Sequence, residues 1–325
     1  RAHLCWPNFA APADSPGRMI FHRMRIHARC RAWLCRALVS LCLLHAPAQA
    51  ADLLLSTAGD TAPLQHFASA LAESRPTDRV RIVPLNDMPP LDQLGDDTRL
   101  ILFGKSALSW RLASPKAPPT LVLQVSKTDA RETLGELQPA KLSVLWQDPA
   151  PHRQLRLLKH LLPNATQVGV LHDPHSAFLI EELRQAASEL DLEIVARAWP
   201  DTRDNKAVID LLKTSDVLLA VADDDLYNPM TAKTLLLTSY SRQHALIGPS
   251  AGFVRAGSLA TTYADQSDRL TTLNQLLDQS PQSWPAGTYS KTFKVLGNPQ
   301  VARALGITLP SDAQLARHLS QGDTP

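Results

Sequence analysis

Cysteine is scarce in this chain, and its placement restricts the chemistry of most of the sequence. All four cysteines lie before Ala51, at Cys5, Cys30, Cys35 and Cys42. Residues 51–325 therefore offer no thiol for a disulfide, a nucleophile or a metal ligand. A segment of this length can bury a sufficient apolar core without disulfide cross-links.

Sequence signatures of nucleotide cofactors are also missing, because the chain has no G-x-x-x-x-G-K-[ST] and no G-x-G-x-x-G. "GPSAG" at 248–252 matches the letters of the catalytic motif G-x-S-x-G and places Ser250 at a strand end. A turn nevertheless fits this segment better than a nucleophile elbow. "FGKS" at 103–106 precedes a helix start that could bind an anion through free N–H groups, which alone is a weak signal. We predict that the protein is not an enzyme and uses no cofactor.

A metal site is weakly suggested and not favoured. "HDPH" at 172–175 brings two histidines close to an aspartate, and Asp223–Asp225 could add carboxylates. The two histidines straddle a proline, however, and the sequence places no third histidine beside them. We predict a polar loop instead, in which Asp173 turns the chain and Ser176 caps the next helix, with no metal.

Aromatic residues make up only 5% of the chain, so there are few flat surfaces on which a sugar could stack. Beyond residue 50 the tryptophans are Trp110, Trp146, Trp199 and Trp284. Core packing is the expected role of most of them. Trp146 is the exception. It lies close to 148–151, where the pattern of strands and helices breaks between two expected lobes, and we predict that it contacts a ligand.

The first fifty residues resemble a secretory leader. Four arginines between Arg25 and Arg36 precede the apolar run Ala37–Ala46, which is too short to span a bilayer. Small residues at Ala48 and Ala50 form an A-x-A cleavage site. We predict a signal peptide cut after Ala50 and a periplasmic protein. Removing it leaves 26 basic and 30 acidic residues, so a nucleic-acid partner is not expected.

From Ala51 onwards, short apolar runs alternate with stretches of helical periodicity. The expected strands are 51–56, 79–85, 99–104, 120–126, 141–148, 167–173, 192–199, 217–222, 245–250, 258–264 and 292–297. The expected helices are 62–74, 152–163, 177–190, 205–214, 230–241, 266–279 and two short ones near the end. This alternation predicts the α/β class, with parallel sheets covered by helices on both faces. A break near 148–151 divides it into two doubly wound, Rossmann-like lobes.

Polar residues follow several of the expected strands. Ligands of open α/β sheets bind outside the carboxyl ends of the strands. That rule selects Ser56, Thr57, Gly104, Lys105, Ser106, Ser126, Asp173, the run Asp223–Asp225, Pro249 and Ser250.

Three consecutive carboxylates end the strand at 217–222. Asp225 or Asn228 can serve as a turn or cap residue before a helix, which leaves at least one acid unexplained. Adjacent like charges are tolerated where solvent or a cation is close. Asp223 and Asp224 either grip an ammonium group of a ligand or belong to a solvated acidic loop, and the sequence gives these two interpretations nearly equal weight.

Several stretches resemble a known family. "HRQLRLLKHLLPNATQVGVLHDPHS", "DVLLAVADDDLYN", "LLLTSYSRQHALIGPSAGFVRAGSLATTYAD" and "LGNPQVARALGITLP" are similar to ABC-transporter substrate-binding proteins of the type I periplasmic fold, in the branch of tryptophan- and tyrosine-type binding proteins. The resemblance covers roughly 151–310. The glycine-rich stretch usual in that family is absent from "ETLGELQPAKLSVLWQD".

The resemblance implies an extracytoplasmic receptor, which we expect to be a monomer, with two lobes that close on a small ligand. Lobe I would comprise 51–147 and about 264–289, and lobe II 148–263 and about 290–325, joined by hinge strands. Lobe II would contribute Asp223, Asp224, Tyr227, Asn228, Ser250 and Phe253 to the ligand site. The ligand, expected to be an amino-acid-like or aromatic molecule, would pass to an ABC permease.

Three other functions stay open. The same fold could report a ligand to a membrane receptor, it could be an accessory protein with a degenerate cleft, or it could be an exported enzyme with a Rossmann-like lobe. The enzyme would need a cofactor fingerprint or a nucleophile–base pair, and we identify neither in the sequence. The altered stretch at 132–148 keeps the accessory role open.

Overall fold

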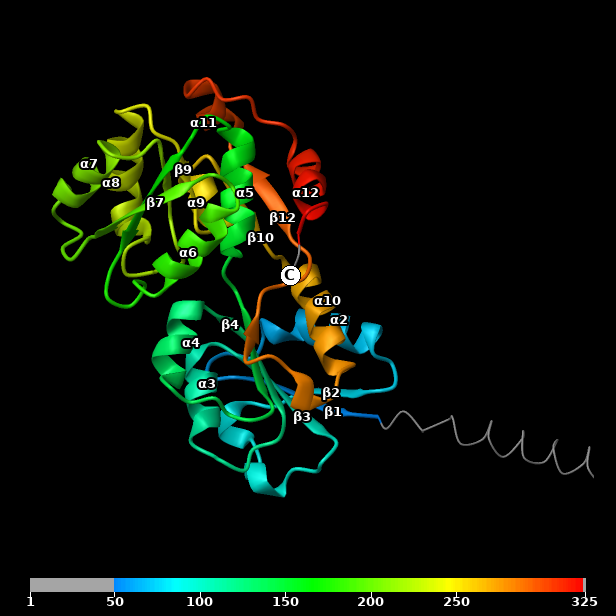
Figure 1. Cartoon of the computed structure of the whole chain (residues 1–325). Helices are drawn as coiled ribbons and strands as arrows, with labels where there is room; N and C mark the ends of the chain where they lie inside the picture. Colours follow the sequence, from blue (N-terminus) through cyan, green and yellow to red (C-terminus); the bar gives the residue numbers. More distant parts are fainter. Residues whose placement is uncertain (1–49, 324–325) are drawn as a thin grey trace, which may run out of the picture. The chain divides into compact units, whose positions relative to one another are not determined.

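The computed structural model describes residues 50–323 (Figure 1). The predicted signal peptide before Ala51 lies almost wholly outside these residues. None of the described helices is both long and apolar enough to cross a membrane.

The first sheet has six parallel strands in the order β11-β5-β4-β3-β1-β2. Its strands are β1 (Asp52–Thr57), β2 (Arg79–Ile82), β3 (Thr98–Phe103), β4 (Thr120–Val125), β5 (Leu142–Trp146) and β11 (Gly287–Thr288). The helices beside it are α2 (Leu64–Ser74), α3 (Lys105–Leu112), α4 (Lys127–Leu134) and α10 (Gln266–Leu277), with short 3-10 turns at Leu85–Asp87, Leu91–Gln93 and Pro281–Ser283. We call this sheet with its helices lobe I.

Both faces of the first sheet are buried, which explains why its strands read as continuous apolar runs. Successive side chains of β1 point to opposite faces, so Leu53 and Leu55 join a core with α2 and α10, whereas Leu54 joins a core with α3 and α4. Figure 1 shows these two helix layers on either side of the sheet.

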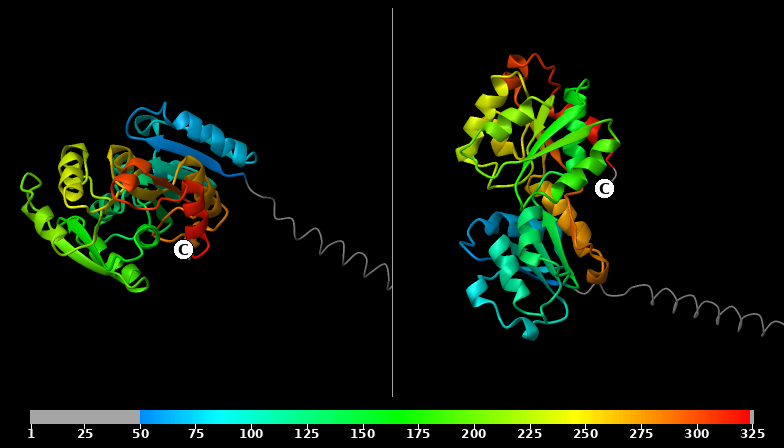
Figure 2. Two further views of the ribbon diagram at one scale, coloured as in Figure 1. Left: turned by 90° about the horizontal axis from the view of Figure 1, so that it is seen from above. Right: turned by 60° about the vertical axis from the view of Figure 1, so that its left-hand side comes forward.

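The second sheet has the order β12-β10-β9-β8-β6-β7, and only the edge strand β12 runs antiparallel to its neighbour. Its strands are β6 (Gln167–His172), β7 (Glu193–Ala198), β8 (Val217–Leu219), β9 (Leu246–Ile247), β10 (Ala260–Tyr263) and β12 (Lys294–Gly297). The helices are α5 (Pro151–Leu161), α6 (Leu179–Ser188), α7 (Lys206–Leu212), α8 (Pro229–Tyr240), α9 (Ala251–Ala256), α11 (Pro299–Ala304) and α12 (Asp312–Ser320). We call this sheet with its helices lobe II, and Figure 2 shows helices on both of its faces.

The chain passes between the two sheets three times. It leaves β5 for α5, leaves β10 for α10, and leaves β11 for β12. The α/β class and the two doubly wound sheets predicted from the alternating pattern are confirmed.

Some local predictions were wrong. The residues after Ser250 form the short helix α9, where the sequence suggested a turn, because the Ser250 hydroxyl accepts the Phe253 N–H and starts a helix. Ser176 does not cap α6, which begins at Leu179 with Phe178 in the cap position. Helix α4 and the two-residue strand β11 were not expected, since both are too short to show a clear period.

Candidate functional site

The strand order of each sheet reverses at one point. In lobe I this point lies between β1 and β3, and in lobe II between β6 and β8. Loops leaving two such strands diverge to opposite faces of the sheet and open a crevice, where doubly wound proteins bind ligands. Thr57 and Gly104 flank this point in lobe I, and Asp173 and the 220–228 loop flank it in lobe II.

The predicted hydroxyl residues of lobe I are mostly committed to the main chain. Ser56 is fully buried and donates to the Val83 carbonyl at 2.6 Å, and Thr57 donates to the Phe103 carbonyl at 3.2 Å. Ser126 caps α4 by accepting the Asp129 N–H at 3.0 Å. Ser106 is exposed in the first turn of α3, after Gly104, whose φ of 90° suits glycine. The free donors of this region are therefore the main-chain N–H groups at the start of α3.

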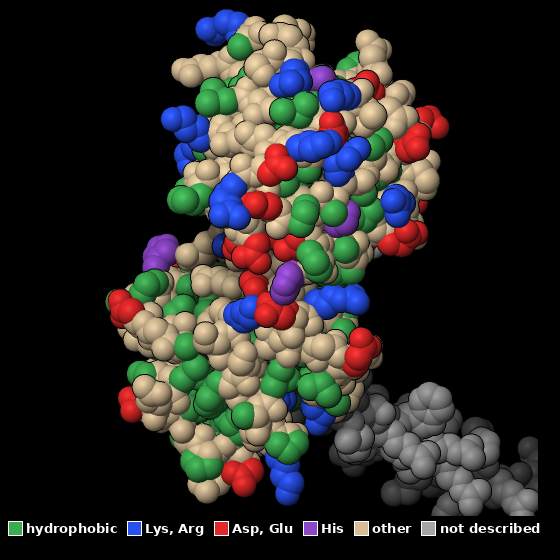
Figure 3. All heavy atoms as spheres, turned by 90° about the vertical axis from the view of Figure 1, so that its left-hand side faces the viewer, with side chains coloured by type: hydrophobic (Ala, Val, Ile, Leu, Met, Phe, Trp, Pro, Cys, Tyr) green, Lys and Arg blue, Asp and Glu red, His purple; other side chains and the backbone are tan. Residues whose placement is uncertain are grey.

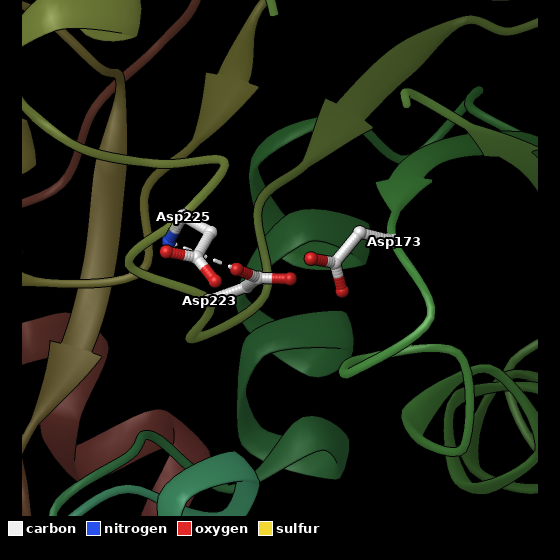
Figure 4. Close-up of side chains that lie close together, drawn as sticks. All are labelled: Asp173, Asp223 and Asp225. Atoms are coloured by element: carbon white, nitrogen blue, oxygen red, sulfur yellow. Dashed lines mark hydrogen bonds between the residues drawn. The ribbon is translucent and has the colours of Figure 1, made fainter. Parts of the chain in front are cut away.

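The three aspartates of the 220–228 loop separate into different environments. Asp223 is only 4% exposed, and its Oδ1 accepts the N–H groups of Asp225 and Leu226 at 3.0 and 3.2 Å. Its Oδ2 is buried and has no hydrogen-bond partner in the part of the chain that the structure describes. Figure 4 shows the Asp223 carboxylate between those of Asp173 and Asp225. Asp223 thus faces into its own lobe.

Asp173 folds the loop after β6 as predicted. Its Oδ1 accepts the N–H groups of His175 and Ser176 at 2.7 and 3.0 Å and the Ser176 hydroxyl at 3.2 Å. Burial alone would raise the pKa of Asp173, but these hydrogen bonds, together with the contact to the Asp223 carboxyl group, outweigh it and lower the pKa. Burial and the nearby Asp173 charge raise the pKa of Asp223. The two carboxyl groups therefore differ in how readily they ionise.

Asp224 is exposed and belongs to the electrostatic environment of both lobes. Burial raises its pKa, and so do the charges of Asp129 in α4 and of Asp225. The charge of Asp224 also raises the pKa of Asp148, which follows β5. Of the three consecutive aspartates, Asp224 is thus the one whose charge interacts with lobe I.

The pKa of Asp148 is also strongly raised. Its Oδ2 accepts the Lys127 N–H at 2.6 Å, whereas its Oδ1 is buried with no partner. Burial first, and then the charges of Asp129 and Asp224, raise its pKa to about 7. Figure 3 shows acidic side chains gathered where the two lobes meet. Carboxylates from both lobes that repel one another are suited to binding a cation.

The residues assigned by resemblance lie partly in packing positions. Tyr227 is buried and donates to the Leu171 carbonyl at 3.1 Å, and burial raises its pKa. Phe253 packs edge-on against it at 6.2 Å between ring centroids. Asn228 caps α8 in a reciprocal box with Thr231. A groove of about 640 Å³ between α8 and α9 is lined by Tyr227, Asn228, Ser250 and Phe253. Neither Asp223 nor Asp224 lines this groove.

Helix α4 carries contacts that the sequence did not reveal. Lys127 forms an ion pair with Glu182 of α6 at 2.6 Å, Thr128 donates to the Ala222 carbonyl at 3.2 Å, and Arg131 lies 4.5 Å from the Phe178 ring. Each contact joins lobe I to lobe II. The motif "SKTD" at 126–129, a serine with an acid three residues later, could have revealed this helix start.

Trp146, which we predicted to contact a ligand, lies beside Lys127, the residue of α4 that pairs with Glu182. The Lys127 ammonium lies 4.5 Å from the Trp146 ring and 5.4 Å from the Tyr289 ring, and the two rings are 4.7 Å apart. The Tyr289 hydroxyl also bonds Glu182 at 3.2 Å. The structure therefore places Trp146 beside the crossing segments, against a lysine that is already paired.

Comparison with known proteins identifies the architecture. No family model and no curated protein matches the chain. A Streptococcus pneumoniae ABC domain solved with L-Trp is 18% identical with a TM-score of 0.52, covering 82% of this chain and 98% of that one. A conserved domain protein from Vibrio cholerae is 16% identical with a TM-score of 0.52, covering 82% and 98%.

A third solved structure extends the likeness. The ligand-free, open form of a Clostridium difficile substrate-binding protein with adhesive properties is 17% identical with a TM-score of 0.59, covering 81% of this chain and 97% of that one. At such identities the likeness concerns the fold. The chain has the two-lobed type I periplasmic-binding-protein fold that its sequence resemblance implied.

Proposed function

We propose that this protein is an extracytoplasmic solute-binding protein that holds a small molecule bearing an ammonium group between its two lobes. The observation that carries the proposal is the meeting of carboxylates from both lobes: Asp129 and Asp148 from lobe I and Asp224 from lobe II. The fold supports the same role, because two lobes joined by crossing segments can close on a ligand.

The charges of these three carboxylates explain how a ligand would favour closure of the two lobes. Without a ligand, the approach of Asp224 to Asp129 and Asp148 is opposed by like-charge repulsion. An ammonium group between them reverses the sign of that interaction. A ligand that contacts both lobes favours the conformation in which they are close. The difference between its affinities for the open and the closed conformation sets how far the equilibrium moves.

The chemistry favours a ligand of amino-acid type. Its ammonium group would bind the carboxylates, and its carboxylate would bind the free N–H groups at the start of α3, near Gly104 and Ser106. The pneumococcal neighbour was solved with L-Trp, which is a molecule of this type.

We further propose that the protein is a periplasmic monomer that delivers its ligand to an ABC permease. Co-purification with the permease would test the delivery step.

Asp224→Asn should weaken binding of the ligand at least tenfold, because it removes the lobe II charge without changing the side chain's size. The ligand is first identified by a thermal-shift screen of amino acids, amines, sugars and purines, and its affinity is then measured by calorimetry. Asp191→Asn is the matched control, since Asp191 is an exposed acid of lobe II at the opposite strand ends, where its φ of 52° tolerates asparagine. Equal affinity in both variants would exclude the proposed interaction between Asp224 and the ammonium group of the ligand.

Binding should also strengthen about tenfold between pH 6 and pH 8. Asp148 holds its proton until about pH 7 in the folded protein, and a cation prefers the ionised form. The charges acting on Asp148 are those of Lys127, Asp129 and Asp224. Asp148→Asn should flatten the pH profile, measured by calorimetry at each pH. A profile that is unchanged in this variant would assign the dependence to another group.

A further inference from the structure

We propose that Asp173, Asp223 and Asp225 form a binding site for a calcium ion within lobe II. Each residue offers a carboxylate oxygen, and these three oxygens all lie within 4.8 Å of one another. Two oxygens on opposite sides of a Ca²⁺ ion are about 5 Å apart, given Ca–O distances of about 2.3–2.6 Å. One ion can therefore contact all three.

The topology of lobe II brings these residues together. Asp173 follows β6, Asp223 and Asp225 follow β8, and the two strands are parallel neighbours on either side of the reversal in strand order. Their carboxyl ends therefore lie at the same edge of the sheet. Figure 4 shows the three side chains pointing toward one another from these two loops.

The second observation is the unpartnered oxygen of Asp223. This side chain is 4% exposed and its Oδ1 is held by two N–H groups, whereas its Oδ2 is buried and has no hydrogen-bond partner within residues 50–323. Figure 4 shows the Asp223 carboxylate reaching toward Asp173. Leaving a buried carboxylate oxygen unpaired is costly. A cation at this position would satisfy it.

The surroundings favour a bare ion over an organic ammonium group. Asp223 Oδ2 has almost no access to solvent, so a substituted amine with its attached carbon has no room beside it. Asp225 is exposed and gives an ion an entry side with space for water ligands. Carboxylates with completing waters form an oxygen-rich site of the kind that Ca²⁺ prefers, whereas Mg²⁺ demands a stricter octahedron.

The ion would have a structural consequence for the 220–228 loop. It would join the β6 and β8 loops and so fix Asp224, which lies between two ligands in the sequence and acts on lobe I. The site itself is built from lobe II alone and needs no solute. Calcium binding and solute binding can therefore succeed or fail separately.

The test is calorimetric titration of the full, chelator-treated protein with CaCl₂, with MgCl₂ in parallel. We expect one site with a Kd of about 0.1–1 mM for Ca²⁺, weaker binding of Mg²⁺, and a melting temperature raised by about 2–4 °C in 10 mM Ca²⁺. Asp223→Asn should weaken Ca²⁺ binding at least tenfold while its amide oxygen can still accept the two N–H groups of the turn. Asp225→Asn, at an exposed position, should weaken it several-fold.

Asp191→Asn should bind Ca²⁺ like the parent protein. Absence of saturable heat and of a thermal shift up to 10 mM Ca²⁺ would overturn the proposal. Binding that is unaffected in both Asp223→Asn and Asp225→Asn would also overturn it, by placing the ion elsewhere. Solute affinity measured in the presence of chelator reports on the proposed function independently of these outcomes.

Discussion

Replacing Arg153 with methionine should lower the free energy of unfolding by about 3–5 kcal/mol. Arg153 is 3% exposed in α5, and its guanidinium donates to Asp323 at 2.6–3.0 Å and to the Ser290 carbonyl at 2.7 Å. It also lies 4.5 Å from the Phe293 ring. Methionine fills similar volume but removes the donor of the Ser290 carbonyl and leaves the Asp323 carboxylate with His152 alone. Chemical denaturation with a fixed m-value would measure the loss.

Arg156→Met is the matched control for this effect. Arg156 lies on the same helix and donates to the Leu319 carbonyl at 2.7 Å, and no carboxylate of the described residues pairs with it. We expect it to cost less than about 1.5 kcal/mol. The double variant Arg153→Met with Asp323→Leu should recover part of the loss, because no charge is then buried alone. A loss in Arg153→Met no larger than in Arg156→Met would show that the ion pair contributes little.

The same ion pair should make stability fall in acid. Burial alone would raise the pKa of Asp323, but hydrogen bonds from His152 and Arg153 lower it to about 2. A carboxyl group whose pKa is depressed on folding contributes stability above its unfolded pKa near 3.9 and loses it as the pH falls through the folded value. The difference in stability between the parent and Arg153→Met should therefore shrink between pH 4 and pH 2.

Lys127→Met should shift the protein away from the conformation in which α4 contacts lobe II. The substitution keeps an apolar stem against Trp146 but removes the ammonium that pairs with Glu182 at 2.6 Å. A half-buried, charge-assisted hydrogen bond of this kind contributes about 1–2 kcal/mol, a 5- to 30-fold change in the ratio of conformations. Small-angle scattering should show a larger radius of gyration, and the affinity for a ligand that requires the closer conformation should fall by the same factor.

Lys206→Met provides the comparison for Lys127. Lys206 pairs with Asp210 at 2.8 Å within α7, and neither residue belongs to the carboxylates through which the two lobes interact. Its removal should leave the radius of gyration unchanged. If Lys127→Met and Lys206→Met scatter alike, the Lys127–Glu182 pair does not hold the lobes together.

Periodicity was sufficient to predict the architecture. Continuous apolar runs such as Leu53–Leu55 indicate strands buried on both faces, and the helical spacing of Leu155, Leu158 and Leu161 indicates a helix with one buried side. These patterns arise from local geometry, which repeats along the chain regardless of what lies opposite. The elements missed were short ones, where a pattern has too few residues to repeat. Helix α9 has six residues and β11 has two.

The sequence by itself determined the α/β fold and the strand ends at which polar residues gather, because both follow from patterns local to the chain. Only the tertiary structure decided what those residues do. Asp223, Asp224 and Asp225 are indistinguishable as a run of three letters, yet Asp223 turns into lobe II beside Asp173, and Asp224 acts on Asp129 and Asp148 of lobe I. Burial and the charge of residues distant in sequence set these differences, since both depend on which loops the strand order brings together.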